Sequence, residues 1–536
     1  MSLNPMTDPL HQESGPATRW TTVNTAEAIP GVPTPLGWTL WNEPVERAMR
    51  GAFCDIGCLR PSDVRFAGRV DDRYSGIFFG RFTANIGEMR RMGDLMPGTS
   101  GDAVEQQILG GLSGGPKGTP SMRRYPVVLA KMPARSLRLP KLLAARRTEI
   151  DAWWRATVEP GAIADGRAAR ARFKEAINYF ELVMRPHSVV TMLAQALYEQ
   201  LTKLATAAGK PELVTRLTTG YGQMEETALM ADLWAVSRGR LTLEAFLAAH
   251  GYHGPAEGEV SSPSWREEPA PLHALLATYK TMDDSAAPSA VEAQRIAERE
   301  AATAELMAGL SAARRPGAKV LLGAAKRYIP LREVGKAAFL QAIDGARAAA
   351  RVLGEDLARS GTVGDPDDVC YLTVGEILGT PPADAKEVVA FRRRKREEYL
   401  GLRLPDTWTG VATPEKIEAT PAAATGAEIT GLAVSPGVVE GRARVVLDAA
   451  TSDLEPGEVL VCQTTDPSWA SLFLVASALV IDIGGALSHG AIVARELGVP
   501  CVINTRVGTR RLRTGDLLRV DGATGVVTVL AAVGSP

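Results

Sequence analysis

The residue in this sequence with the clearest chemical use is His489, which lies in the run GGALSHGA of residues 484–491. An apolar stretch before this run predicts a buried strand over 479–483, and the pattern after it predicts a helix over 491–497. A neutral imidazole, with an ordinary pKa of about 6.5, is a competent nucleophile near neutral pH, and a phosphorylated ring nitrogen stays labile enough to pass the group on. The sequence therefore predicts a histidine that carries a phosphoryl group at the start of a helix.

The residues next to His489 have types that suit this role. The amide groups of residues 490–492 and the positive end of the helix dipole would stabilise a dianionic phosphoryl group by roughly 0.3–2 kcal/mol. Gly490 is small enough to let a bulky donor or acceptor approach the ring, and the hydroxyl of Ser488 could orient the ring or cap the helix. A lone histidine at such a turn more often has its nitrogens satisfied by backbone groups, so the prediction depends on the whole motif.

The chain divides into four predicted parts. Residues 1–30 are predicted to form a flexible arm, residues 31–410 a mainly helical region, residues 411–427 an exposed, semi-stiff linker rich in Ala, Thr and Pro, and residues 428–536 a small strand-rich domain. The predicted strands of that domain are 442–447, 458–462, 479–483, 501–504, 517–520 and 526–530. The expected fold class is therefore multidomain, α together with α/β.

Two stretches interrupt the helical region, 250–269 and 360–368, because their glycines and prolines prevent a helix from continuing. The first stretch holds a predicted polar cluster that could bind the acceptor and take the proton from its nucleophilic oxygen. Its members are His253, Glu257 and Glu259, followed by Trp265, Arg266, Glu267 and Glu268. The alternative is a solvated turn between helices.

Two further groups of residues are candidates for contacts with the acceptor or the phosphoryl group. The first group is charged, and its spacing would place several members on one helix face, where they could clamp a phosphoryl group. Its members are Arg327, Arg332, Glu333 and Lys336. The alternative for this group is a surface charge network. The second group is aromatic and could line an apolar pocket. Core packing is the more common use of such residues, which here are Trp38, Trp41, Phe78 and Phe79. The basic run at 392–398 predicts a solvated helix face.

Composition bounds the remaining possibilities. The chain has 536 residues, of which 45% are hydrophobic, and this length suits roughly three or four domains. Lys and Arg number 60 against 61 Asp and Glu, so no overall basic field favours nucleic acid or an anionic membrane. Five scattered cysteines do not predict a disulfide framework, residues 1–35 show no signal peptide, and the apolar window at 469–481 is shorter than the ~18 residues of a membrane span. We expect a cytoplasmic protein.

Residues 431–530 resemble the swivelling phosphohistidine domain of phosphoenolpyruvate synthase, pyruvate phosphate dikinase and rifampin phosphotransferase. Besides the histidine motif, the matching stretches are Ser435-Pro436-Gly437, residues 464–469 (TTDPSW), residues 494–500 (ARELGVP) and Asp521-Gly522. The sequence SHGA at 488–491 is closer to the motif of rifampin phosphotransferase and phenylphosphate synthase than to that of phosphoenolpyruvate synthase. The resemblance implies that His489 is the residue that is phosphorylated.

The region before the linker resembles, more loosely, the acceptor-binding domain of rifampin phosphotransferase. The matches are Thr34-Pro35-Leu36, Gly80-Arg81 with Asn85, Pro97-Gly98, residues 251–255 (GYHGP) with Glu257, Trp265-Arg266-Glu267, Arg332-Glu333 with Lys336, and Asp368 with Tyr371-Leu372. This resemblance implies a small organic acceptor bound in the helical region, and Mg²⁺ as a cofactor whose ligands we do not identify in the sequence.

One departure from the family concerns ATP. The ATP-grasp nucleotide domain of rifampin phosphotransferase has no counterpart in this sequence, and no Gly-x-x-x-x-Gly-Lys-[Ser/Thr] loop is present. We therefore expect a separate ATP-grasp subunit to phosphorylate His489. Phenylphosphate synthase looks like a system that is split between subunits in this way. Two alternatives stay open. The chain could be a non-catalytic binding or regulatory module that retains the fold, or another donor such as phosphoenolpyruvate or a phosphocarrier protein could charge His489.

Overall fold

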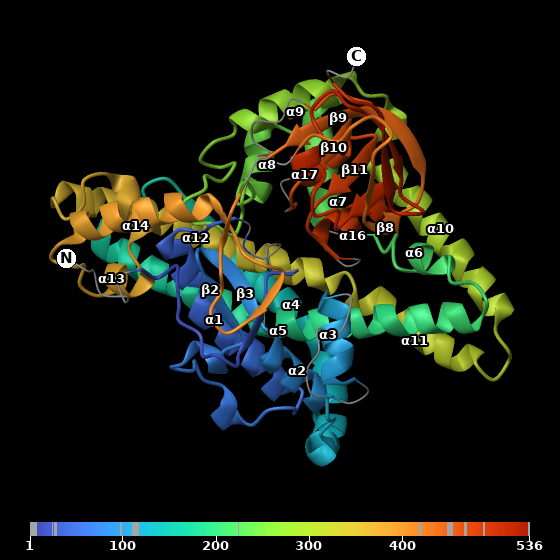
Figure 1. The fold of residues 1–536 in the computed structure, drawn as a ribbon, viewed down its shortest axis with the longest axis horizontal. Coiled ribbons are helices and arrows are strands. Elements are labelled where there is room, and N and C mark those ends of the chain that lie inside the picture. Colours follow the sequence, from blue (N-terminus) through green and yellow to red (C-terminus); the bar gives the residue numbers. More distant parts are fainter. Residues whose placement is uncertain are drawn as a thin grey trace. The chain divides into compact units, whose positions relative to one another are not determined.

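The structure is a computed structural model, and it describes residues 8–23, 25, 29, 31–96, 99–109, 117–222, 225–417, 421–447, 454–465, 469–485 and 488–533. The chain forms two compact units, coloured along the sequence in Figure 1. Unit 1 consists of Met1–Val189, Gly258–Ser261 and Gly335–Ile417, and unit 2 of Val190–Glu257, Ser262–Val334 and Glu418–Pro536. Each unit is therefore built from segments that are distant in the sequence.

Unit 1 is mainly helical. Its helices are α1 (Pro35–Asp55), α2 (Ile86–Leu95), α3 (Gly101–Leu109), α4 (Tyr125–Val158), the first part of α5 (Gly166–Ala207), most of α12 (Leu331–Arg359), α13 (Val374–Leu378) and α14 (Ala385–Leu400), with 3-10 turns η2 (Pro61–Asp63), η3 (Val70–Asp72), η4 (Met122–Arg124) and η6 (Pro366–Tyr371). The N-cap of α1 is Thr34, whose hydroxyl accepts a hydrogen bond from the amide of Gly37, and Pro35 occupies the first turn, where its missing N–H does no harm.

The N-terminal segment of unit 1 differs from the prediction of a flexible arm. Strand β1 (Arg19–Thr21) pairs with β3 (Arg81–Asn85) on one side and β5 (Thr407–Thr409) on the other, in a sheet of order β2-β3-β1-β5 with β2 at Ser75–Phe78. Trp20 is fully buried in a cluster with Phe78, and its indole N–H donates to Ser14. Burial of this large ring holds the described residues 8–23 in place, so the prediction was wrong for them; residues 1–7 lie outside the described part.

The predicted linker of residues 411–427 is also largely ordered. Strand β6 (Glu415–Lys416) pairs with β4 (Leu402–Arg403) in unit 1. At the other end of the segment, Ala423 is 2% exposed, and its amide donates to the carbonyl of Arg511 in unit 2. Most of the described residues of this segment are exposed, as predicted, whereas Ala412 and Ala423 are buried. Residues 418–420 lie outside the described part.

Unit 2 combines helices with a large sheet. Its helices are the second part of α5, α6 (Leu213–Leu217), α7 (Glu225–Ser237), α8 (Leu243–His250), α9 (Ala270–Thr281), α10 (Pro288–Gly309), α11 (Arg315–Tyr328), α15 (Ala470–Phe473), α16 (His489–Leu497) and α17 (Gly508–Arg511), with the 3-10 turn η5 (Asp284–Ala286). The predicted break at 250–269 is confirmed, since α8 ends at His250 and α9 begins at Ala270.

The sheet of unit 2 has eight strands in the order β7-β14-β13-β9-β10-β11-β12-β8. The strands are β7 (Glu428–Thr430), β8 (Leu432–Ser435), β9 (Val438–Val446), β10 (Val459–Cys462), β11 (Ala478–Ile481), β12 (Cys501–Ile503), β13 (Leu517–Asp521) and β14 (Val526–Ala531). Strands β9 to β12 are mutually parallel and the outer pairs are antiparallel. All six predicted strands are present.

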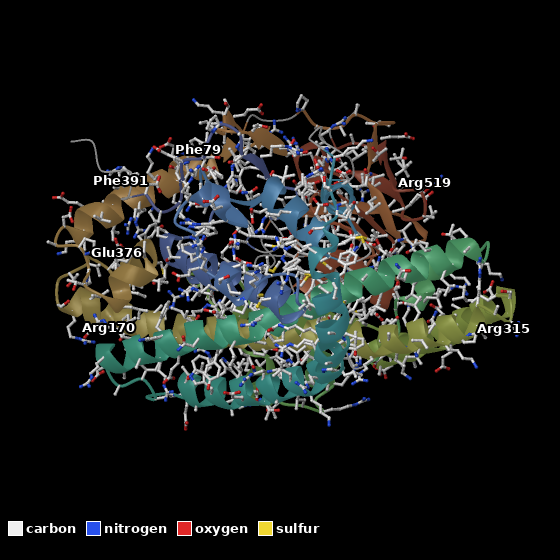
Figure 2. All side chains as sticks on the ribbon, turned by 90° about the horizontal axis from the view of Figure 1, so that it is seen from below. Phe79, Arg170, Arg315, Glu376, Phe391 and Arg519 are labelled. Carbon is white, nitrogen blue, oxygen red and sulfur yellow. The ribbon has the colours of Figure 1, made fainter. Side chains whose placement is uncertain are left out.

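Both faces of the parallel strands are buried, and alternate residues serve alternate faces. Val459, Val461 and Val480 belong to one apolar cluster, whereas Leu460 and Leu479 belong to the other. The second cluster also contains residues of α7, α8 and α9, which lie beside the strands in Figure 1. On the outer strand β13 the alternation continues, and Figure 2 labels the exposed Arg519 between two buried residues.

The predicted fold class, multidomain α and α/β, is confirmed: a mainly helical unit and an open mixed sheet with helices. Among the described helices, none combines the length and the apolar character that crossing a membrane requires.

Candidate functional site

His489 is the first residue of α16, the helix that connects the parallel strands β11 and β12. Gly484 follows β11 with a φ of +155°, and a Cβ there would lie 2.2 Å from Ile503, so this turn requires glycine. Ser488 is the N-cap of α16, and its hydroxyl accepts a hydrogen bond of 3.3 Å from the amide of Ala491. Such a cap stabilises a helix by about 1 kcal/mol. Ser488 therefore caps the helix, which is one of its two predicted roles. Ala486 and Leu487 of the motif lie outside the described residues.

The imidazole of His489 is enclosed, with 7% of the residue exposed. Its Nδ1 lies 3.5 Å from the hydroxyl oxygen of Thr465, which follows β10, and its ring lies 6.3 Å from the ring of Phe473 in α15. Its Nε2 lies 3.8 Å from Oε1 of Glu226, in the first turn of α7. The two ring nitrogens therefore face different parts of unit 2, one toward the sheet and its helices, the other toward a helix from the middle of the chain.

The glycine after the histidine has a packing role in the structure. A Cβ at Gly490 would lie 2.7 Å from Ile481 and 2.8 Å from the hydroxyl of Thr465. Glycine at 490 thus lets the first turn of α16 lie close to β11 and brings Thr465 near the imidazole. Whether this small residue also admits a donor or acceptor stays a prediction.

The expected role of the first-turn amides needs a correction. The amide of Ala491 donates to the Ser488 hydroxyl, and that of Ile492 donates to the Ser488 carbonyl at 3.0 Å. Two of the three amides predicted to bind a phosphoryl group are therefore occupied by the cap. The dipole of α16 remains available to an anion at its N-terminus.

A buried carboxylate fixes the next turn along the same edge of the sheet. Asp482, which follows β11, is 4% exposed and accepts hydrogen bonds from the hydroxyl of Thr505 and the amides of Gly508 and Thr509. The 504–506 turn that it supports contains two residues with positive φ, Asn504 and Arg506, both at 62°. Asp482 therefore holds the loop after β12 and not the imidazole.

The other end of α16 carries two more ionisable residues in tight surroundings. Gly498 closes the helix in the left-handed conformation, as is common at this position. Arg495 is 5% exposed, and burial lowers the pKa of its guanidinium. Both carboxylate oxygens of Glu496 accept from the amide of Gly220, at 3.1 and 2.9 Å, and burial raises the pKa of Glu496 to about 7.

The predicted polar cluster around His253 is only partly assembled. His253 and Glu257 are 5% and 4% exposed and are hydrogen-bonded through Nδ1, so this loop is not a solvated turn. Glu259 belongs to unit 1, where it accepts from the amide and hydroxyl of Thr34 at 2.9 and 2.7 Å. Arg266 is half-buried, and its guanidinium lies 4.0 Å from Glu267. Roles of His253, Glu257 and Arg266 toward an acceptor stay predictions.

The predicted phosphoryl clamp spans two helices instead of one. Arg327 lies in the last turn of α11, exposed and over the ring of Tyr328, whereas Arg332, Glu333 and Lys336 lie in the first turns of α12. Pro330 separates the helices because it cannot donate to a continuing helix. Arg332 and Lys336 are four residues apart, as predicted for one face, and Glu333 is 4% exposed.

The aromatic and basic candidates serve the interior of unit 1. Trp38 is 1% exposed, and its ring lies 5.8 Å from the ring of Phe82. This is core packing, the alternative to an apolar pocket. In the basic run at 392–398, Arg392 is 3% exposed and forms a bidentate ion pair with Glu376, labelled in Figure 2. The run is therefore not a wholly solvated face. Pro97, Gly98 and residues 466–468, which supported the resemblance, lie outside the described residues.

No three His, Cys, Asp or Glu side chains come together as a metal site in the described part of the chain. Because Mg²⁺ is usually bound by only one or two carboxylates together with substrate phosphates, the expected Mg²⁺ stays a prediction.

Two residues near the imidazole were not predicted as site residues. Thr465 follows β10, and the carboxyl ends of adjacent parallel strands lie at one edge of a sheet, so its nearness to His489 could have been inferred from the order of the strands. Glu226 gives no such signal, because its helix comes from a distant part of the chain.

Family comparisons agree with this geometry. Residues 454–525 match the family described as PEP-utilising enzyme, mobile domain, and residues 188–333 match the rifampicin phosphotransferase fourth domain. The segment that carries His489 is thus a mobile domain of the PEP-utilising class. The segment that carries Glu226 relates the chain more specifically to rifampicin phosphotransferases, which confirms the resemblance predicted from the sequence.

The match to similar proteins covers only part of each of them. A rifampicin phosphotransferase of Streptomyces sviceus is 31% identical over 309 residues, 54% of this chain and 34% of that protein. An uncharacterized protein of Mycobacterium tuberculosis is 34% identical over 334 residues, 62% of this chain and 36% of its own. An uncharacterized phosphotransferase of Bacillus subtilis is 38% identical over 191 residues, 33% of this chain and 23% of its own. The chain spans about a third or less of the length of these relatives.

Proposed function

We propose that this chain is a phosphotransferase component that carries a phosphoryl group on Nε2 of His489 and transfers it to a small organic acceptor. The observation that supports this most directly is the orientation of the imidazole at the start of α16. Nδ1 is directed to Thr465 of the same domain, and Nε2 is directed to a different segment of the chain. Of the two nitrogens, Nε2 is the one that a donor or acceptor outside the mobile domain can reach.

The chemistry that this site would support is phosphoryl transfer by positioning. The transition state of such a transfer is loose, so holding the phosphorus in line between two nucleophiles and compensating its charge are the main contributions a protein can make. The N-terminus of α16 contributes a favourable dipole, worth roughly 0.3–2 kcal/mol to an anion. Ser488 and Gly490 keep the helix start and the ring in a fixed relation to β11.

Burial of the imidazole defines what must move. Thr465 and Phe473 belong to the domain of His489, whereas Glu226 belongs to the segment that matches the fourth domain of rifampicin phosphotransferase. Separation of the mobile domain from α7 would uncover Nε2 and leave Nδ1 covered. We propose that such a swivelling movement carries His489 between the donor and the acceptor.

The donor and the acceptor complete the proposal. We propose that ATP is used by a separate ATP-grasp subunit and that the acceptor binds in the helical region, where Arg332, Glu333, Lys336, Arg266, His253 and Glu257 are the candidate contacts. Two of the relatives are named as rifampicin phosphotransferases, and the part of each that resembles this chain is about a third of its length. About two thirds of each of these relatives lies outside the matched part.

The test is to incubate the full chain with labelled phosphate donors and to search for acid-labile, base-stable phosphate. The donors are ATP with an ATP-grasp partner protein, phosphoenolpyruvate, and phosphoramidate, which phosphorylates imidazole nitrogens directly. We expect one equivalent of label on His489 and none in His489→Ala. Label that persists in His489→Ala, or a wild-type chain that no donor labels, would overturn the proposal and favour a non-catalytic binding module.

A further inference from the structure

Glu226 is the carboxylate that faces the reactive nitrogen of His489. Its Oε1 lies 3.8 Å from Nε2, and both side chains are 8% exposed. The two residues come from different family segments, 188–333 and 454–525. The contact is thus made between the mobile domain and the helices on which it lies, at the atom that the proposed function uses.

The position of Glu226 is well defined by its surroundings. It lies in the first turn of α7, where the helix dipole favours a negative charge. Leu229, Met230 and Leu233 of the same helix are buried in the cluster that contains Phe473 and Ala491 of the mobile domain. A second contact is made nearby, since the hydroxyl of Tyr279 donates to the carbonyl of Ser471 at 2.8 Å. Apolar packing and hydrogen bonding therefore bring this carboxylate to the imidazole.

A phosphoryl group on Nε2 and this pairing exclude one another. The phosphorus atom and its three oxygens would occupy the space in which Oε1 lies, 3.8 Å from the nitrogen. The charges also conflict, because a phosphoryl dianion and a carboxylate repel each other strongly where little water screens them. After transfer the nitrogen carries a proton instead, and an N–H beside a carboxylate is attractive.

We propose that Glu226 is a positioning residue that pairs with Nε2 of His489 as the N–P bond breaks and thereby speeds the loss of the phosphoryl group. The inference rests on the proposed function of His489. In the step itself the acceptor hydroxyl oxygen forms a bond to phosphorus, the N–P bond breaks and its electron pair returns to Nε2. The hydroxyl proton ends on Nε2, where the carboxylate of Glu226 pairs with it. Phosphohistidine and neutral alcohol thus become phosphate ester and protonated nitrogen, with atoms and charge conserved.

The chain offers a matched control in the neighbouring residue. Glu225 lies in the same first turn of α7 and is also acidic. Burial lowers the pKa of His250, and the charge of Glu225 acts against that shift. Glu225→Gln therefore removes one charge from the same helix end and leaves the residue that faces His489 in place.

The experiment uses the full chain charged with labelled phosphoramidate and follows the loss of phosphohistidine with water as the acceptor. In Glu226→Gln we expect the loss to slow by about tenfold, which corresponds to about 1.4 kcal/mol in activation free energy. Glu225→Gln should behave as the wild type, and Glu226→Asp, which keeps the charge on a shorter side chain, should restore part of the rate.

The outcomes separate this inference from the function on which it rests. If wild-type His489 is labelled and Glu226→Gln shows the wild-type lifetime of the phosphohistidine, the positioning role is overturned and the phosphohistidine stands. If the wild type takes no label, the proposed function itself is overturned. If Glu226→Gln melts at a lower temperature, the rescue by Glu226→Asp decides, because a purely structural contact would restore stability without restoring the rate of loss.

Discussion

Two histidines of unit 2 each face a glutamate, and the two pairs differ in almost every other respect. In the loop between α8 and α9, His253 bonds to Glu257 four residues further along the chain, through Nδ1. At the start of α16, His489 faces Glu226 from a distant helix, through Nε2. Both rings are nearly covered, at 5% and 7% exposure. Burial and a carboxylate neighbour therefore do not by themselves indicate which of the two histidines could carry a phosphoryl group.

The difference lies in what would have to move to expose the ring. The ring of His253 lies 4.2 Å from that of Tyr252 and 5.8 Å from that of Trp265, and the carbonyl of His253 accepts from the amide of Trp265. All of these contacts belong to one loop, so further exposure of the ring requires the loop itself to rearrange. The Nε2 of His489 is covered by a different segment, and separation of two folded parts suffices. A histidine that exchanges a group needs the second arrangement.

The most direct test of this comparison is to replace each of the two histidines in turn. His489→Asn should reduce labelling by phosphoramidate by about three orders of magnitude, to background, because the nucleophile is gone. His253→Asn should leave labelling of His489 close to the wild-type level. Mass spectrometry of base-stable phosphopeptides measures both. A phosphate found on His253 would show that the loop opens as readily as the mobile domain and would end the distinction.

The two glutamates should differ in their effects on stability. Glu257→Gln weakens a buried pair and should lower the free energy of unfolding by about 3 kcal/mol, near the lower limit for removing one member of such a pair. Glu226→Gln removes a longer contact at a separable surface and should lower it by less than about 1 kcal/mol. Thermal unfolding of the full chain, followed by circular dichroism, compares the variants. Equal losses would mean that α7 and the mobile domain form a permanent contact.

Local patterns predicted the half of the site that belongs to the mobile domain. The strand before the glycines, the capping serine and the histidine are consecutive in the sequence, and the alternation of apolar residues in β10 and β11 is a period-two signal. These features depend on neighbours within a few residues. The sequence therefore identified His489, Ser488 and the six strands, and its resemblance to a known domain agreed with them.

Features formed by distant segments could not be predicted in this way. Strand β1 is ordered by pairing with residues 84–85 and 407–409, and its own composition resembles that of a loop. Ala423 is buried in an apolar cluster with a sheet whose strands run from residue 428 to residue 531. Glu226 sits in an acidic first turn, which by itself indicates only a helix N-terminus. In each case the deciding contact is made by a partner that no local pattern reveals.

A smaller effect is expected from Thr465, which lies 3.5 Å from Nδ1 of His489. Thr465→Val removes the hydroxyl that holds the ring with Nε2 outward while keeping the side-chain shape. We expect the rate of labelling to fall about fivefold, as for the loss of about 1 kcal/mol from a single hydrogen bond. Thr465→Ser keeps the hydroxyl and is the matched control. A Thr465→Val variant labelled at the wild-type rate would mean that Nδ1 needs no partner for Nε2 to react, as a ring fixed by packing alone would allow.

The smallest expected effect concerns pH and the opposite end of α16. Burial raises the pKa of Glu496 to about 7, although the Gly220 amide and the charges of Arg495 and Arg295 act in the opposite direction and Glu292 adds to the rise. Tyr221, whose ring lies beneath the guanidinium of Arg299, is a further ionisable group that interacts with Glu496.

Because the pKa in the folded chain exceeds the ordinary value of 4.5, folding favours the protonated form. The stability that Glu496 contributes is therefore complete below pH 4.5 and is lost as the pH rises through about 7. Between pH 6 and pH 8, the melting temperature of the wild type should fall by about 2 °C more than that of Glu496→Gln, which keeps an acceptor for the Gly220 amide. If both proteins show the same dependence, the pH response comes from elsewhere, and the His489 end of α16 becomes the next place to test. A response confined to Glu496 would mean that α16 is attached to its neighbours by a pH-sensitive contact at the end opposite His489.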